Sequence, residues 1–155
     1  MADASSATTK EFGFTRIIDA PRERVFEAWT DPDQLAAWWG PTGFSTARST
    51  VSIDARPGGE WAATMKSDGE DGTEVPFHGV YKDLESPSVL SFTLIDDNHV
   101  DADNAELIVV AFNDQGEKTE IVFKQIGHLP DEQIEPSRQG WLSFMESLAD
   151  YLAQA

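Results

Sequence analysis

The segment AWTDPDQLAAWWGPTGF, residues 28–44, holds three of the five tryptophans of this 155-residue chain. On its upstream side, Val25, Phe26 and Trp29 are spaced to share one face of a helix. Pro21 suits the first position of that helix, because an amide there would have no partner within the helix. The spacing therefore predicts a short helix that begins at Pro21 and buries Trp29.

A second short helix is predicted directly after the first. Asp31 can cap its start, Pro32 suits its first position, and Gln34 stands at the capping-box position. Gly40 allows the left-handed conformation that often ends a helix, and Pro41 prevents its continuation. The apolar face of this helix consists of Leu35, Trp38 and Trp39. Because helices this short are marginally stable alone, the tryptophans are expected to anchor them to a neighbouring layer.

Alternating apolar and polar residues predict strands on both sides of these helices. The predicted strands are EFGFTRIID (11–19), STVSID (49–54), EWAATMK (60–66), PFHGVYKDL (76–84), VLSFTLID (89–96), AELIVVAFN (105–113) and KTEIVFKQI (118–126). Short turns such as RPGG and DQGE join neighbours in sequence. The strands are therefore expected to form an antiparallel sheet with one covered face and one solvated face.

A long helix is predicted at the C-terminal end, where the apolar residues have helical spacing over residues 137–153. Its apolar face consists of Trp141, Phe144, Met145, Leu148 and Leu152. Pro136 is expected to exclude earlier turns, so the helix should begin near Glu135 or Ser137. Gly140 is expected to let the helix approach the sheet closely. The predicted fold class is α+β: a curved antiparallel sheet of about seven strands wrapped around this helix, with two short helices after the first strand.

Composition indicates one domain and excludes several kinds of site. Residues 1–10 are small and polar, which predicts a disordered tail followed by a folded domain over residues 11–155. The chain has no cysteine, so disulfides and thiol chemistry are excluded. Neither a secretory leader nor an apolar run long enough to span a bilayer is visible, which predicts a cytoplasmic protein.

The charge disfavours polyanionic partners. The chain has 28 acidic and 11 basic residues, which give a formal net charge of −17 at pH 7. The basic residues are scattered along the sequence, whereas binding to nucleic acid or to an anionic membrane needs a basic patch. We therefore expect the protein to bind neither nucleic acid nor membranes.

Four motifs in a fixed order resemble a known family. They are APRERVFEAWTDPDQLAAWWGPTGF (20–44), RPGGEW (56–61), PFHGVYKDL (76–84) and the pair Gly140-Trp141. Over residues 12–153 the chain resembles the family named for homology to the activator of heat-shock protein 90 ATPase, within the START-like (SRPBCC) superfamily. The resemblance implies a helix-grip fold. It also implies a cavity between sheet and helix, which in many relatives takes lipids, hormones or polyketides.

Ligand pockets are lined mainly by apolar and aromatic side chains, which selects a set of candidate residues. The candidate ligand-binding residues are Trp38, Phe44, Trp61, Tyr81, Phe92, Trp141, Phe144 and Met145. Trp38 or Phe44 is expected to close one mouth of the cavity. Adjacent helical positions point about 100° apart, so one of Trp38 and Trp39 should face inward while the other lies against a neighbour. Simple core packing is the alternative for each of these side chains.

The sequence offers little for catalysis. His78 is the one histidine within a predicted strand, and it could act as a general base if Glu74, Asp83 or Glu106 reached it. A surface or structural histidine is the alternative. No HxH or HExxH spacing occurs, so no metal site is expected. RPGG lacks the Lys-Ser/Thr that follows in a phosphate-binding loop, and no cofactor is expected.

Three functions remain open. The first is non-enzymatic binding of a small hydrophobic ligand by a monomer or weak dimer. The second, implied by the resemblance, is a chaperone-linked interaction protein of the stress response. The third is an enzyme of the cyclase, dehydratase or hydrolase kind found elsewhere in the superfamily. A continuous buried cavity would favour the first, a filled core with an exposed apolar patch the second, and a cavity containing His78 or paired carboxylates the third.

Overall fold

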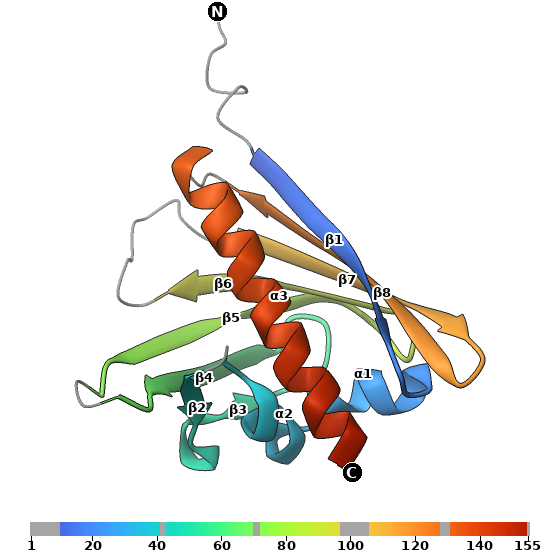
Figure 1. Cartoon of the computed structure of the whole chain (residues 1–155), viewed down its shortest axis with the longest axis horizontal. Coiled ribbons are helices and arrows are strands. Elements are labelled where there is room, and N and C mark those ends of the chain that lie inside the picture. Colours follow the sequence, from blue (N-terminus) through green and yellow to red (C-terminus); the bar gives the residue numbers. More distant parts are fainter. Residues whose placement is uncertain (1–9, 41–42, 70–71, 97–105, 128–130, 155) are drawn as a thin grey trace, which may run out of the picture.

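A curved antiparallel sheet and a long helix across its concave face make up most of the structure (Figure 1). The computed structural model describes residues 10–40, 43–69, 72–96, 106–127 and 131–154. Its elements in chain order are β1 (Lys10–Ile18), α1 (Arg22–Thr30), α2 (Pro32–Trp38), β2 (Phe44–Thr46), the 3₁₀ turn η2 (Arg48–Thr50), β3 (Ser52–Ile53), β4 (Glu60–Ser67), β5 (Glu74–Glu85), β6 (Val89–Asp96), β7 (Glu106–Gln115), β8 (Lys118–Gly127) and α3 (Asp131–Gln154). The predicted helix-grip fold is confirmed.

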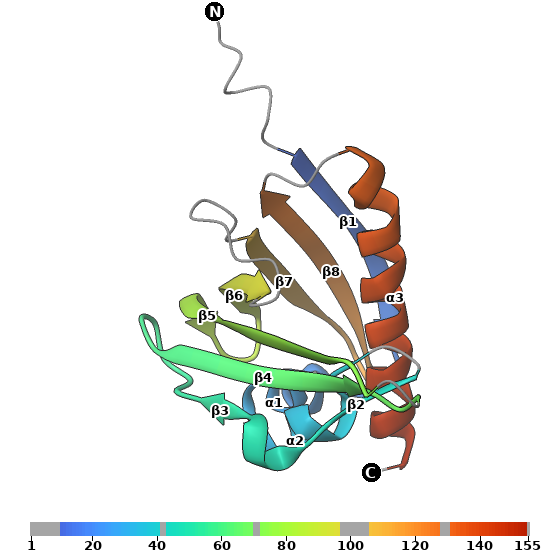
Figure 2. The ribbon, with the colours of Figure 1, turned by 90° about the vertical axis from the view of Figure 1, so that its left-hand side faces the viewer.

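The strand order is β1-β8-β7-β6-β5-β4-β2, and β3 also pairs with β4, at Trp61 and Ala62. Neighbours in sequence are mostly neighbours in the sheet, but β1 pairs with β8, so the first and the last strand of the chain lie side by side. Figure 2 shows the curvature of the sheet, with α3 along one side and α1 and α2 packed at one end of the curve. The three helices and the concave face of the sheet therefore enclose one core.

Side chains alternate between core and surface along the strands, as the period of a strand requires. On β7 and β8, Ile108, Val110, Phe112, Ile121 and Phe123 are fully buried, whereas the residues between them are half-buried or exposed. The predicted apolar face of α3 is also confirmed, because all five of its residues are buried: Trp141, Phe144, Met145, Leu148 and Leu152. No helix in the described ranges is both long and apolar enough to cross a membrane.

At the junction between α1 and α2, the predicted cap at Asp31 and the predicted position of Pro32 are confirmed. The Asp31 carboxylate accepts hydrogen bonds from the backbone amides of Asp33 (2.9 Å) and Gln34 (3.4 Å), and Pro32 opens α2. Nε1 of Trp38 donates to the carbonyl oxygen of Ala28 at 2.8 Å, which ties the end of α2 back to α1. The two short helices thus support each other by capping and by one buried hydrogen bond.

Replacing Asp31 by alanine should lower the free energy of unfolding by about 0.5 to 2 kcal/mol, because two amides of α2 lose their acceptor. Asp31→Asn should remain close to wild type, since asparagine caps helices as well as aspartate does. Urea titration of both variants measures the difference. Equal losses in the two variants would contradict the capping role.

Two predictions about α3 were wrong. The helix α3 begins at Asp131 rather than near Glu135 or Ser137, and it includes Pro136. Proline removes one helical hydrogen bond, to the carbonyl of Glu132, and both residues are exposed, so water can satisfy that carbonyl. Gly140 does not permit a close approach either, because a Cβ added there would have no atom within 4 Å.

The strand predictions differ from the structure at the edges. Of the segment STVSID, only Ser52 and Ile53 form a strand, and a 3₁₀ turn precedes them. The strand β2 was not predicted; its three residues pair with the end of β4. The first strand begins at Lys10, one residue before the predicted domain start. The rest of the predicted tail, residues 1–9, lies outside the described residues.

Candidate functional site

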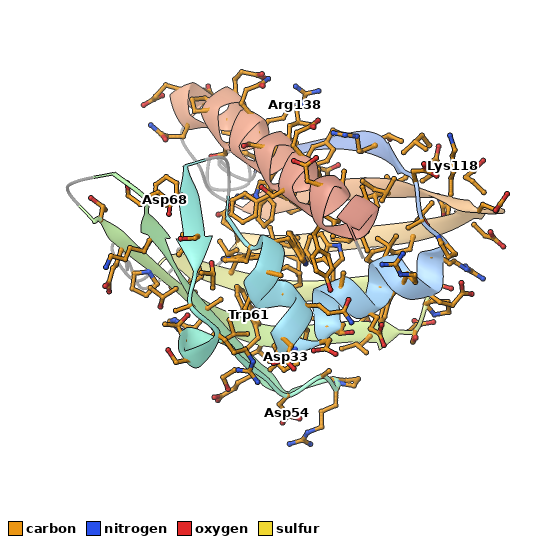
Figure 3. The ribbon with its side chains drawn as sticks, turned by 60° about the horizontal axis from the view of Figure 1, so that its bottom comes forward. Asp33, Asp54, Trp61, Asp68, Lys118 and Arg138 are labelled. Carbon is orange, nitrogen blue, oxygen red and sulfur yellow. The ribbon has the colours of Figure 1, made fainter. Side chains whose placement is uncertain are left out.

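Trp39 lies at the centre of a cluster of aromatic rings between α3, α2 and the sheet. Its ring centroid lies 4.9 to 6.0 Å from those of five other rings. The partners are Trp38, Trp61, Phe77, Trp141 and Phe144. All five contacts are edge-to-face, the geometry in which aromatic pairs attract one another. Figure 3 shows side chains that fill the space between the helices and the sheet, with Trp61 labelled in the interior of the view and charged residues such as Asp54 and Lys118 labelled at the periphery of the molecule.

The position of Trp39 follows from the end of α2. The helix stops at Trp38, and Trp39 is its C-terminal cap with an extended backbone (φ −66°, ψ 120°). Gly40 has a φ of 123°, a conformation that glycine adopts readily. The chain therefore turns sharply after Trp38, so that both tryptophans are buried, each 2% exposed. Trp38 packs against Trp29 of α1, with ring centroids 4.9 Å apart.

A small cavity lies between the short helices and strands β4, β5 and β6. Its volume is about 10 Å³, and it is lined by Trp29, Leu35, Trp39, Trp61, Tyr81, Leu90 and Phe92. A volume of this size holds about one water molecule. Tyr81 is 3% exposed, and this burial raises the pKa of its phenol above the ordinary value, so the hydroxyl is uncharged near neutral pH.

The predicted site residues fall into three groups. Three of them line the cavity: Trp61, Tyr81 and Phe92. Three lie buried on α3, where Trp141 and Phe144 contact Trp39 and Met145 is fully buried. Trp38 is turned toward α1, and Phe44 is half-buried at the start of β2, beside Gly40.

The predicted set did not contain four residues that line the cavity: Trp29, Leu35, Trp39 and Leu90. Trp29 and Leu35 belong to the predicted apolar faces of the short helices, so periodicity indicated their burial but not their place at the cavity. Trp39 was not selected because the expected 100° between adjacent side chains holds only if both tryptophans are helical. In the structure the helix ends between them.

The five tryptophans differ in how their indole N–H groups are satisfied. Nε1 donates to a protein oxygen in Trp38 (Ala28 O, 2.8 Å), in Trp61 (Thr93 O, 2.9 Å) and in Trp141 (Gln125 Oε1, 2.7 Å). Nε1 of Trp29 and Nε1 of Trp39 are buried and have no hydrogen-bond partner among the described residues. A buried unpaired donor costs about 1 to 3 kcal/mol, so these two groups need an explanation.

A separate polar network lies near the middle of α3. Gln125 on β8 donates from Nε2 to Oε1 of Glu106 on β7 (2.9 Å) and accepts the N–H of Trp141. Glu106 and Gln125 are 7% and 4% exposed, and both face the core. A Cβ on Gly127 would overlap the Glu106 carboxylate, so this glycine makes room for it. The network holds Trp141 against the sheet and satisfies buried polar atoms.

The residues considered for catalysis do not come together at the cavity. His78 is exposed on β5, on the face opposite to Tyr81. Glu106 faces the core on β7, so it and His78 lie on opposite faces of the sheet. Within the described ranges, no group of three or more His, Asp or Glu side chains is arranged to hold a metal ion.

The sequence matches a family model described as activator of Hsp90 ATPase homolog 1-like protein over residues 19–153. No curated protein matches the sequence.

Solved structures with the same fold come from several bacteria. A protein from Chromobacterium violaceum is 25% identical, with a TM-score of 0.78 over 91% of this chain and 96% of its own. The AHSA1 protein from Silicibacter pomeroyi is 21% identical, with a TM-score of 0.76 over 94% and 99%. An AHSA1-like protein from Aeromonas hydrophila is 21% identical, with a TM-score of 0.73 over 94% and 93%.

Proposed function

Since the chain belongs to the family of activator of Hsp90 ATPase homolog 1-like proteins, we propose that it binds a small hydrophobic molecule between its helices and the sheet without converting it. The observation that carries this proposal is the cavity at the aromatic cluster. Among the described residues, its lining consists of tryptophan, tyrosine, phenylalanine and leucine side chains. Such walls favour apolar ligands, because burial of apolar surface drives their transfer from water.

The ligand enters by moving side chains apart. The cavity of about 10 Å³ is far smaller than the roughly 300 to 1,000 Å³ of pockets that take drug-sized ligands. In this proposal the structure represents a closed form, and part of the binding free energy is used to open it. The lining comes from α1, from α2 and its C-terminal cap, and from three strands, so a displacement of the short helices relative to the sheet would enlarge the cavity.

Binding without chemistry is favoured over catalysis because the described residues of the cavity lining include no acid or base that titrates near neutral pH. Tyr81 is the one ionisable residue among the lining residues, and burial keeps it uncharged. His78 lies exposed on the opposite face of its strand. General acid–base catalysis at this cavity would lack its usual residues.

Titration with apolar molecules tests the proposal. Decanoic acid, flavone and an anthraquinone polyketide such as emodin are added to the ¹⁵N-labelled protein, while amide and indole signals are recorded. We expect at least one compound to shift signals of Trp39, Trp61 and Tyr81 at near-millimolar or lower concentration. The signals of Ile17 and His78, both exposed, serve as the control and should stay in place.

If none of these compounds shifts signals around the cavity, ligand binding is rejected and the second candidate takes its place. That candidate is a chaperone contact, and the description of the family supports it. It is less favoured because, among the described residues, Ile17 is the sole large hydrophobic side chain that is exposed, at 49%. Protein contacts of this kind usually need a larger apolar patch.

A further inference from the structure

Two indole N–H groups without partners lie in side chains of the same small cavity. Trp29 and Trp39 are each 2% exposed, both line the cavity, and neither Nε1 has a partner among the described residues. The other three tryptophans donate to protein oxygens at 2.7 to 2.9 Å. Because buried polar groups in native proteins are nearly always paired, two exceptions at one cavity point to an acceptor that comes from outside the chain.

The cavity itself offers little to accept these hydrogen bonds. Leu35, Leu90 and Phe92 have no polar side-chain atom, and tryptophan side chains only donate. The phenol oxygen of Tyr81 could accept a hydrogen bond, but neither indole N–H donates to it. A purely hydrocarbon ligand would leave both N–H groups unpaired. A ligand with an acceptor would satisfy them.

The charge of this acceptor is constrained by its surroundings. No basic residue is among the described residues that line the cavity, and the whole chain has a formal net charge of −17. Moving an anion into an apolar site without a cation is strongly unfavourable, and the net charge would also repel it. A carbonyl oxygen accepts hydrogen bonds without bringing a charge.

We infer that the cavity is selective for uncharged apolar molecules that carry a carbonyl group, whose oxygen accepts hydrogen bonds from Nε1 of Trp29 and of Trp39. The inference rests on the proposed function, since it names the chemical class of the ligand. It differs from that proposal in assigning a recognition role to two particular N–H groups. One rival explanation is that a single water molecule, for which the cavity has room, accepts these hydrogen bonds. The other is that these groups point at neighbouring ring faces, in N–H···π contacts that need no ligand.

Acetophenone and isopropylbenzene provide a matched pair of probes, because they have nearly the same shape and only the first has a carbonyl. In ¹H–¹⁵N spectra, acetophenone should move the indole N–H protons of Trp29 and Trp39 downfield, as expected on gaining a hydrogen bond. Isopropylbenzene should not do so. The signals of Trp38, Trp61 and Trp141 serve as internal references, because their N–H groups are already bonded.

Phenylalanine variants separate the N–H group from the ring. Trp39→Phe and Trp29→Phe should each weaken acetophenone binding about tenfold relative to isopropylbenzene binding, because only the ketone loses a hydrogen bond. Trp38→Phe is the matched control, since its N–H donates to Ala28 inside the protein, and it should leave the ratio of the two affinities unchanged. If a variant does not fold, the wild-type shifts still decide the outcome.

The outcomes distinguish selectivity for a carbonyl group from hydrophobic binding as such. If isopropylbenzene and acetophenone both bind but neither shifts the two indole protons, the carbonyl inference is overturned while hydrophobic binding stands. Equal weakening of both probes by Trp39→Phe also overturns it, because the ring rather than the N–H then matters. If neither these probes nor the larger compounds bind, both proposals fail together.

Discussion

Replacing Leu148 by alanine should lower the free energy of unfolding by about 2 to 5 kcal/mol. Leu148 is fully buried on the face of α3 that packs on the sheet, between the equally buried Met145 and the nearly buried Leu152. Truncation removes apolar surface from the core and leaves a cavity that rigid neighbours fill poorly. A loss of this size is a large part of the stability of a typical domain.

Leu142→Ala is the matched control for this substitution. Leu142 lies on the same helix but is half-buried, so the same change should cost clearly less. Denaturant titration of both variants gives the two free energies, and an unchanged m-value would show that the comparison is valid. A cost below half of one kcal/mol for Leu148→Ala would contradict the packing of α3 described above.

Local sequence patterns were sufficient to predict most of the fold. The buried face of α3, the cap at Asp31 and the alternation along β7 and β8 were all predicted correctly, because each depends on residues close in sequence. The start of α3 was wrong because proline was treated as a barrier, although its lost hydrogen bond lies on an exposed face. The strand β2 was missed because its three residues are held mainly by pairing with β4.

The candidate site was harder to predict than the fold. The central position of Trp39 depends on where α2 ends, and a shift of one residue turns the side chain in a different direction. Whether the space at the aromatic cluster is filled or empty depends on how rings from five or more elements pack together. No pattern along the chain contains that information, so the volume of about 10 Å³ could not be predicted.

The burial of Glu106 could have been predicted from the alternation of residues along its strand. Glu106 has the same parity as Ile108, Val110 and Phe112, so the alternation of β7 places it on the core side. Glu106 was considered only as a partner for His78, which lies on the outward face of β5. A charged residue in phase with a buried apolar face predicts a polar network in the core, since such a group needs hydrogen-bond partners.

Gly79→Ala and Gly140→Ala should change stability in opposite directions, although the substitution is the same. A Cβ on Gly79 would overlap the carbonyl oxygen of Thr93 and lie 2.7 Å from Nε1 of Trp61. That nitrogen donates to the same carbonyl at 2.9 Å, across the space that the glycine leaves open. Overpacking costs about 1 to 3 kcal/mol, and the broken buried hydrogen bond adds to it, so we expect a total of about 2 to 5 kcal/mol.

At Gly140, an added Cβ meets no atom within 4 Å, and the residue lies inside α3. Alanine there should stabilise the protein by about 0.5 to 1 kcal/mol, because it restricts the unfolded chain and favours the helix. Urea titration measures both changes, and the indole signal of Trp61 reports whether its hydrogen bond to Thr93 is lost in Gly79→Ala. A stable Gly79→Ala variant with an unchanged Trp61 signal would mean that β5 and β6 can separate at little cost. In that case Trp61 can move at a low cost in free energy. A ligand could then enter by displacing Trp61 as readily as by displacing the short helices.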